Sequence, residues 1–257
     1  VTVDDWNAAF FRRTFMIKHT ATFCGPCYYL SENLHTLEGM RPGRMLYASF
    51  YQNSNQGLSL PWAGAYDYMA DTRNNTLPTA VINNYGWFAG SYDANTMANM
   101  VDEATEKLPA STQIAGQVAL NNGTLEANLS IAAKEAGAYH VSVFVLEDGI
   151  VHYQVGGGSN YVHNNLTLGE ITPKYGQEVQ LEAQKVNKVQ ISGALPTINI
   201  DGEAHTSDPA NLHVLVVVYK SGSFTSSLGL TPMNLGSYVD NVVNIPVNGF
   251  TLLEYEN

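Results

Sequence analysis

The amino-acid sequence predicts an α/β domain followed by an all-β domain, and three observations lead to this fold class. The chain has 257 residues, a length that suits two domains better than one. Up to residue 110, apolar residues follow helical and strand-like spacings in turn, which is typical of an α/β unit. After the segment "LPAST" (108–112), apolar and polar residues alternate, as in strands that bury one face. We therefore expect domains at residues 1–110 and 111–257.

The first half is expected to follow the order α-β-α-β-α-β-β-α. The predicted segments are a helix at 3–12, a strand at 13–21, a helix at 24–39, a strand at 43–52, a helix at 61–71, a strand and hairpin at 76–92 and a helix at 93–108. In the helix that follows the first strand, Leu30, Leu34 and Leu37 recur at helical spacing and mark its buried face. Gly39 is a residue at which such a helix commonly ends.

The two later helices of this half have their own start signals. Pro61 suits a first helical turn, and Trp62 begins an apolar face that continues to Met69. Asp93 is the expected N-cap of the last helix, because its carboxylate can accept a backbone N–H of the first turn. Both segments are therefore predicted to be amphipathic helices that pack on the sheet.

The second half is expected to form seven to nine short strands. The segment "TLEANLSIAAK" (124–134) alternates strictly between apolar and polar residues. Similar patterns lie at 138–148, 151–155, 178–186, 188–195, 212–220 and 239–249. Strands at this spacing resemble those of immunoglobulin and fibronectin type III folds, which predicts an antiparallel β-sandwich. Pro246 lacks an N–H for a ladder, so its strand is expected at an edge.

The composition argues against several classes of function. A net charge of −11 disfavours nucleic acid as a partner, because binding a phosphate backbone requires clustered Lys and Arg. No apolar run approaches the roughly 18 to 20 residues that a membrane-spanning helix needs. Two cysteines in one motif and seven scattered histidines lack the spacing of a metal site. We therefore expect neither a metal nor another cofactor.

Both cysteines lie in the motif "FCGPC", where a buried strand is followed by a helix. The first thiol would face unpaired backbone N–H groups and the positive end of the helix dipole, which favours its thiolate and lowers its pKa. Cys24 is the expected nucleophile, and Cys27 is the expected resolving thiol that attacks a mixed disulfide. Cys24 and Cys27 are thus candidate catalytic residues for thiol–disulfide exchange.

The motif "FCGPC", together with "TLPTAVI" (76–82), resembles the thioredoxin superfamily. The resemblance implies a thioredoxin-like domain in the first half of the chain, with a cis peptide bond between Leu77 and Pro78. It also implies that the backbone of Leu77 lies beside the cysteines, where it would pair with an incoming peptide. Leu77 and Pro78 are therefore the implied substrate-binding residues.

Two positions depart from the thioredoxin pattern and are candidate modulators of the cysteines. Phe23 stands where thioredoxins have a tryptophan. Lys18, six residues before Cys24, stands where they have a buried acid that assists proton transfer. Lys18 has two open interpretations: its charge lowers the thiol pKa, or its ammonium reaches solvent, which is the commoner arrangement for a lysine on a strand.

A second resemblance covers the chain from about Arg13 to its C-terminal end. The segments "LEDGIVHYQVGG" and "NYVHNNLTLGEIT" resemble a family of 28-kilodalton outer-membrane lipoproteins of Bacteroidetes-type bacteria, which join a thioredoxin-like domain to a β-sandwich. This resemblance implies export by a lipoprotein signal and a lipid anchor that this sequence does not include. It implies a location in the cell envelope, at the outer membrane, where the protein faces the periplasm or the surface.

Two further features of the second half are interpreted as structural instead of functional. His163 in "YVHNN" is interpreted as a structural, hydrogen-bonding histidine at the start of a strand, because buried polar groups mostly satisfy one another. The segment "VGGGSN" (155–160) lacks the lysine of a phosphate-binding loop and is interpreted as a hairpin loop.

Two functions from different classes remain open at the level of sequence. The first is a thiol–disulfide oxidoreductase whose partners are thiols or disulfides of envelope proteins. The second is a surface binding or adhesion protein without enzymatic activity, in which the cysteine pair is a structural or vestigial disulfide.

Overall fold

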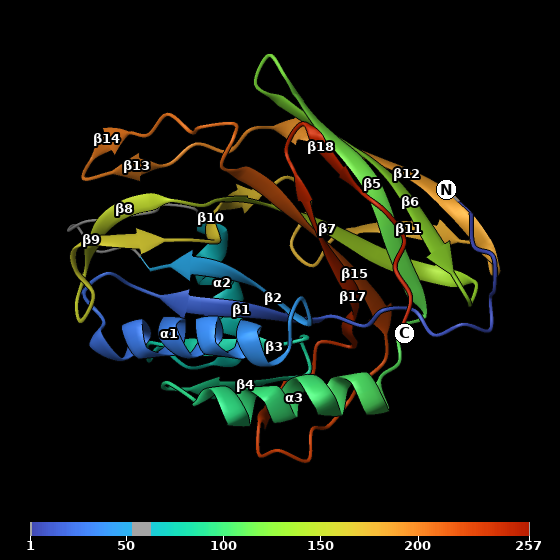
Figure 1. Cartoon of the computed structure of the whole chain (residues 1–257), viewed down its shortest axis with the longest axis horizontal. Helices are drawn as coiled ribbons and strands as arrows, with labels where there is room; N and C mark the ends of the chain where they lie inside the picture. Colours follow the sequence, from blue (N-terminus) through green and yellow to red (C-terminus); the bar gives the residue numbers. More distant parts are fainter. Residues whose placement is uncertain (1, 53–62, 257) are drawn as a thin grey trace.

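The computed structural model describes residues 2–52 and 63–256, and these residues form three helices and eighteen strands (Figure 1). The first half contains β1 (Thr14–Thr20), α1 (Gly25–Met40), β2 (Met45–Tyr51), α2 (Ala63–Thr72), β3 (Thr79–Ile82), β4 (Gly86–Ala89) and α3 (Ala94–Lys107). Pro61 and Trp62, which the sequence places at the start of the third predicted helix, lie outside the described residues.

In the described part of the second half, residues 111–256, the regular elements are all strands. They are β5 (Thr112–Asn121), β6 (Thr124–Ala133), β7 (Gly137–Glu147), β8 (Ile150–Gln154), β9 (Gly158–His163), β10 (Leu166–Glu170), β11 (Gln177–Leu181), β12 (Lys185–Ala194), β13 (Asn199–Ile200), β14 (Glu203–Ala204), β15 (Leu212–Ser221), β16 (Thr231–Pro232), β17 (Ser237–Pro246) and β18 (Gly249–Thr251). None of the described helices is long and apolar enough to span a membrane.

The helix predicted at residues 3–12 is wrong. This segment contains no helix, and its only strand-like pairing is an isolated bridge between Phe10 and Tyr255. Phe10 is buried in a small cluster that also includes Trp6 and Tyr255. Contacts with the C-terminal end of the chain therefore hold this segment in an irregular conformation with a turn near Trp6, although the spacing of Trp6 and Phe10 fits one face of a helix.

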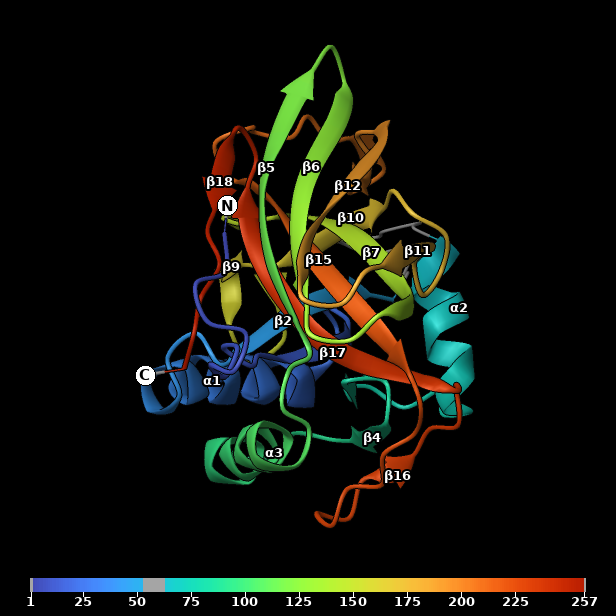
Figure 2. The ribbon, with the colours of Figure 1, turned by 90° about the vertical axis from the view of Figure 1, so that its right-hand side faces the viewer.

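The larger sheet has ten strands in the order β16-β4-β3-β1-β2-β10-β7-β15-β17, with β11 paired to β7. In the first half, β1 pairs with β2 in parallel and with β3 in antiparallel fashion. Helices α1 and α3 cover one face of this region, and α2 covers the other (Figure 2). Leu30, Leu34 and Leu37 of α1 are all buried against the sheet and α3, as the helical spacing predicts.

The sheet continues across the predicted domain boundary. Strand β10 from the second half pairs in parallel with β2, through Leu166 and Ser49, and β16 pairs with β4 at the opposite end. The described chain is thus mostly β-structure with three helices, in mixed and antiparallel sheets. The division at residues 110 and 111 stays a prediction.

A four-stranded antiparallel sheet of order β12-β6-β5-β18 forms the outer layer of the second half. It packs against β7, β10, β15 and β17, and the apolar residues between these two layers form the largest buried cluster. Two packed layers of antiparallel strands are therefore present, one of which belongs to the sheet that continues into the first half, and the likeness to immunoglobulin and fibronectin type III folds stays a prediction. Pro246 ends β17, which lies at the edge of its sheet, as predicted.

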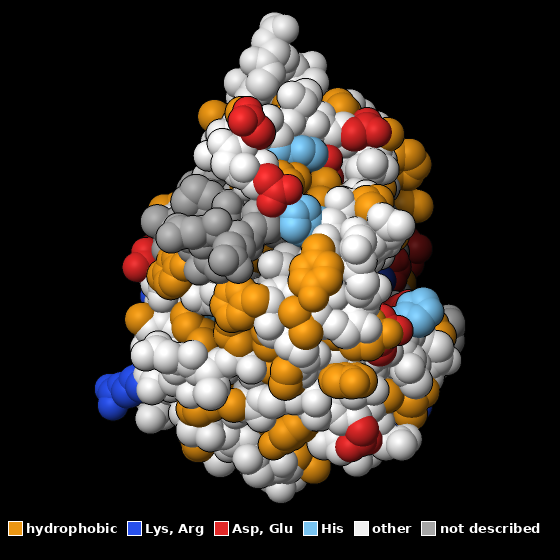
Figure 3. Space-filling model, turned by 90° about the vertical axis from the view of Figure 1, so that its left-hand side faces the viewer, with side chains coloured by type: hydrophobic (Ala, Val, Ile, Leu, Met, Phe, Trp, Pro, Cys, Tyr) orange, Lys and Arg blue, Asp and Glu red, His pale blue; other side chains and the backbone are white. Residues whose placement is uncertain are grey.

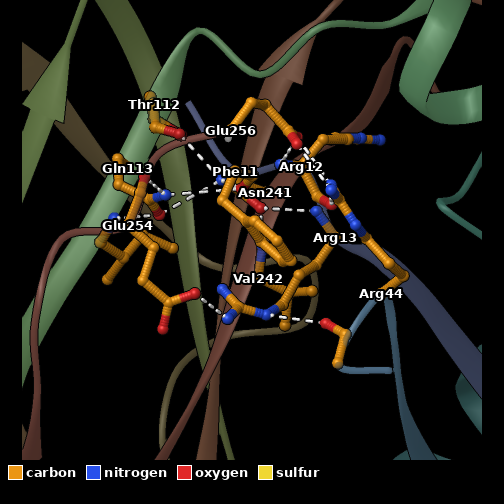
Figure 4. A network of polar contacts seen from close by, with 12 residues as sticks. Phe11, Arg12, Arg13, Arg44, Thr112, Gln113, Asn241, Val242, Glu254 and Glu256 are labelled. Carbon is orange, nitrogen blue, oxygen red and sulfur yellow. Dashed lines mark hydrogen bonds and ion pairs between the residues drawn. The ribbon is translucent and has the colours of Figure 1, made fainter. Parts of the chain in front are cut away.

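The two ends of the chain meet beside β17 in a polar network (Figure 4). Arg44 forms two hydrogen bonds of 2.6 Å with the carboxylate of Glu256, and its guanidinium lies 3.8 Å from the centre of the Phe11 ring. Asn241 of β17 donates hydrogen bonds to the carbonyl oxygens of Phe11 and Thr112. These contacts join the N-terminal segment, the C-terminal segment and the start of β5.

Candidate active site around Cys24 and Cys27

Cys24 and Cys27 form a disulfide at the junction of β1 and α1. Cys24 is the N-cap of α1, and its Sγ accepts a 3.2 Å hydrogen bond from the backbone N–H of Cys27. Pro26 lies in the first turn, where a missing N–H removes no helical hydrogen bond. The strand and helix that the sequence predicts around this motif are confirmed. Because both sulfurs lie at the N-terminus of a 16-residue helix, a negative charge on Cys24 would be favoured there.

Leu77 lies against the cysteines, although more than fifty residues separate them in the sequence. It packs on a buried cluster formed by Ala21, Cys24 and Cys27. The Leu77–Pro78 peptide bond is cis, and Pro78 directly precedes β3, the neighbour of β1 in the sheet. The structure therefore places Leu77 beside the pair, while the roles of Leu77 and Pro78 in binding a substrate stay predictions.

Phe23 lies at the surface, and 52% of the residue is exposed. Other large apolar residues that are exposed on α1 and on the β8–β9 hairpin are Tyr29, Val151, Tyr153 and Val162. Figure 3 shows hydrophobic side chains gathered over the middle of the face where α1 begins and this hairpin lies, with few Lys and Arg side chains. An apolar surface of this kind suits contact with another protein.

The Lys18 side chain is almost fully buried, so the interpretation that its ammonium extends into bulk solvent is wrong. Only 3% of the residue is exposed, and burial lowers the pKa of its ammonium to about 7. Nζ donates a 3.0 Å hydrogen bond to Oγ of Ser31, and Ser31 donates to the carbonyl oxygen of Cys27. Lys18 is thus connected to the second cysteine through one serine.

Gln154 is a residue of the site that the sequence did not indicate. It ends β8, only 3% of it is exposed, and its Nε2 donates hydrogen bonds to the carbonyl oxygens of Cys24 (3.0 Å) and Ala21 (3.3 Å). The next residue, Val155, donates its backbone N–H to the carbonyl oxygen of Thr22 at 2.8 Å. A glutamine before "VGGG" signals a hairpin turn at most, because the contact spans about 130 residues.

The tip of the β8–β9 hairpin packs closely on the first turn of α1. A Cβ atom built on Gly156 would lie 3.0 Å from Cδ1 of Tyr28, and one built on Gly25 would lie 3.5 Å from Cγ1 of Val155. Residues 155–157 form the turn of the hairpin, whereas residues 158–160, which the sequence analysis also assigned to the loop, already belong to β9. The position of this turn leaves Cys24 only 7% exposed.

His163 has the structural role that the sequence suggested, although it ends β9 instead of starting a strand. Its Nδ1 and the hydroxyl of Tyr51 are 2.6 Å apart, and the two rings meet edge to face. Burial, with a contribution from the charge of Lys18, lowers the pKa of His163 to about 4. Among the described residues, no group of three His, Cys, Asp or Glu is arranged to hold a metal ion.

Neither a family model nor a curated protein matches this sequence. Among solved structures, HBP35 of Porphyromonas gingivalis is similar to this protein, with a TM-score of 0.70 and 12% sequence identity. The match covers 94% of this chain and 77% of the HBP35 chain. The chain shares its fold with HBP35. The protein AGR_C_4864 of Agrobacterium tumefaciens matches 95% of this chain and 97% of its own, with a TM-score of 0.53 and 14% identity. At these low sequence identities, the similarity shows a common fold only. HBP35 comes from a species of the Bacteroidetes, the bacterial group of the lipoprotein family that this sequence resembles.

Proposed function

We propose that this protein exchanges thiols and disulfides with other proteins through Cys24 and Cys27. The observation that carries the proposal is the position of Cys24, whose Sγ caps α1 and accepts the N–H of Cys27. In the reduced protein, the helix N-terminus would stabilise the Cys24 thiolate relative to the thiol. The exposed apolar residues around the site, Phe23 among them, would receive the partner protein.

The exchange has two steps. The Cys24 thiolate attacks one sulfur of a substrate disulfide, a mixed disulfide forms, and the other substrate sulfur leaves as a thiolate. Cys27 then attacks Sγ of Cys24, which forms the Cys24–Cys27 disulfide and releases the second substrate thiolate. The substrate gains two electrons from the cysteine pair, and its sulfurs take up the two protons that the pair loses. Leu77, beside the pair, would contact the substrate backbone.

We further propose that the protein acts in the cell envelope, as a lipid-anchored member of the 28-kilodalton lipoprotein family. The resemblance of "LEDGIVHYQVGG" and "NYVHNNLTLGEIT" to that family motivates this proposal. The shared fold with a protein of a Bacteroidetes species supports it. Fractionation of cells that produce the full-length precursor tests it, because recovery in the cytosol would contradict an envelope location.

Trapping of the mixed disulfide tests the exchange activity. A Cys27→Ser variant keeps the nucleophile and lacks the resolving thiol, so it should accumulate mixed disulfides with envelope proteins. The Cys24→Ser variant is the matched control and should trap none. If the Cys27→Ser variant also traps none, and the wild-type protein does not reduce insulin, the proposed activity is overturned.

A second candidate function is a binding protein in which the disulfide is structural. The near-complete burial of both cysteines beneath the hairpin favours this alternative. The two functions differ in the pKa of Cys24 after reduction. A value near about 8.5, that of a free thiol, would favour the binding protein, whereas a strongly lowered pKa would favour exchange.

A further inference from the structure

A cleft of about 630 Å³ lies beside α1, on the side of the hairpin. Its walls come from α1, from β2 and from the end of β9 with the turn that follows it. The volume is in the range of sites that bind small organic molecules. Apolar side chains line part of the cleft: Leu34, Leu37, Met45 and Leu46.

Lys18 lines this cleft, and its ammonium forms no ion pair with a described carboxylate. Among the described lysines, four form ion pairs with an acid, and Lys18 is not one of them. Its Nζ instead faces the hydroxyl of Ser31 at 3.0 Å and the ring of Tyr47, whose centre is 5.1 Å away. The pKa of Lys18 is lowered by burial alone, without the opposing effect of a nearby acid.

A buried, uncompensated ammonium is costly, because the protein interior solvates charge poorly. Buried charges in proteins are therefore usually paired with an opposite charge. Two of the three N–H donors of Nζ are not used by Ser31, so the ammonium can still donate to a ligand. Lys18 thus supplies a site for an anion at a point where a cleft gives access.

A second polar group of the cleft is also incompletely satisfied. His163 lines the same cleft, is almost fully buried, and its Nε2 has no hydrogen-bond partner among the described residues. Tyr161 lies edge to face with His163, at a distance of 4.9 Å between ring centres. The rings of Tyr161 and His163 therefore line an end of the cleft that the charge of Lys18 influences.

The opening of the cleft restricts the charge of the ligand. Glu32, Glu38 and Asp148 also line the cleft, and carboxylates repel phosphates and other multiply charged anions. Glu32 accepts a hydrogen bond from Tyr161, and Asp148 accepts one from the backbone N–H of Asn165, which holds both acids in place. One buried cation and an acidic rim together suit an anion with a single charge.

We propose that this cleft binds a small organic monocarboxylate, whose carboxylate pairs with Lys18 and whose apolar body lies against the half-buried side chains of Leu46 and Tyr47. The site does not use the sulfur atoms of Cys24 or Cys27, so it is independent of the proposed exchange activity. Binding is therefore expected in the oxidised protein and also in a Cys24→Ser, Cys27→Ser double variant.

Two isosteric probes test the proposal on the wild-type protein. Phenylacetate carries the carboxylate, and phenylacetamide has nearly the same shape without the charge. At about pH 6 Lys18 carries its charge, because its pKa is lowered only to about 7. Titration calorimetry should show phenylacetate binding about tenfold or more tightly than phenylacetamide, the difference expected for a charge-assisted hydrogen bond. In NMR spectra, phenylacetate should shift the amide signals of Ser31 and His163.

A variant of the lysine tests the same pairing. Lys18→Met keeps most of the side-chain volume and should abolish the preference for phenylacetate over the amide. Lys188→Met is the matched control, since Lys188 also donates to a serine hydroxyl but is exposed on β12, away from the cleft. Equal affinity for the two probes, or no binding of either probe or of butyrate at millimolar concentration, overturns the proposal. The wild-type comparison decides the question even if Lys18→Met does not fold.

Discussion

Nε2 of Gln154 donates a 3.0 Å hydrogen bond to the carbonyl oxygen of Cys24, which ties the β8–β9 hairpin to the cysteine motif. Together with the bond from Val155 to Thr22, this contact holds a hairpin from the second half of the chain over a disulfide from the first half. A partner that reacts with Cys24 has to displace this hairpin or approach from the side of Leu77.

Replacing Gln154 by leucine should make the disulfide more accessible. The substitution removes the hydrogen bonds to Cys24 and Ala21, each worth about 0.5–1.5 kcal/mol. A loss of about 1.4 kcal/mol would raise the population of the displaced hairpin about tenfold. The rate at which dithiothreitol reduces the disulfide should rise by up to about the same factor. It is measured by stopping the reaction at successive times and determining the number of free thiols.

Gln177→Leu is the matched control for this experiment, because Gln177 is exposed on β11, distant from the cysteines in the sheet. Its reduction rate should equal that of the wild-type protein. A Gln154→Leu protein that is folded and reduced at the wild-type rate would show that the hairpin does not limit access to Cys24.

The sequence predicted those parts of the site that depend on neighbouring residues. The capping of α1 by Cys24 and the burial of Leu30 and Leu34 follow from local spacing, which determines which face of a helix is apolar. The position of Gln154 does not follow from local spacing, because its partners lie about 130 residues earlier in the chain. A single sequence without homologues contains no signal for such a pair.

Lys18 and the N-terminal segment show the same limit. A lysine on a strand is usually solvated, and only the packing of α1 and Tyr47 over Lys18 removes it from water. Similarly, the spacing of Trp6 and Phe10 fits a helix, but both residues pack in a cluster with Tyr255, which lies near the other end of the sequence. Tertiary contacts decided both outcomes against the local preference.

Two glycines of the hairpin provide a matched pair that tests how closely its tip packs on α1. Gly156 and Gly158 have similar positive φ angles of +92° and +86°, so alanine should strain the backbone at both by about 1 kcal/mol. Only at Gly156 would the added Cβ press on Tyr28, at 3.0 Å, whereas nothing lies within 4 Å at Gly158. Urea unfolding should therefore show Gly156→Ala to be less stable than Gly158→Ala by about 1–3 kcal/mol. Equal stabilities would contradict the close packing.

Asn241 should be among the residues whose replacement destabilises the fold most. Its Nδ2 donates to Phe11 and Thr112, and its Oδ1 accepts from the backbone N–H of Arg13, all near the junction of the two chain ends. Asn241→Leu would leave these groups without partners, at a cost of about 2–4 kcal/mol in the free energy of unfolding. Asn199→Leu, at an exposed position of β13, is the control and should change the stability by less than about 0.5 kcal/mol.

Lys18 should make the stability of the protein depend on pH between about 7 and 10.5. Burial lowers the pKa of Lys18 from 10.5 to about 7, so in this range the unfolded chain binds a proton that the folded chain does not. Stability therefore rises with pH across this window, and below pH 7 the full cost of burying the charge is present. Lys18→Met removes this cost, so the variant should exceed the wild-type protein in stability most at about pH 6, with a difference that shrinks toward pH 10. Unfolding by guanidinium chloride at both pH values measures the two differences, and a difference independent of pH would show that Lys18 does not titrate in this range.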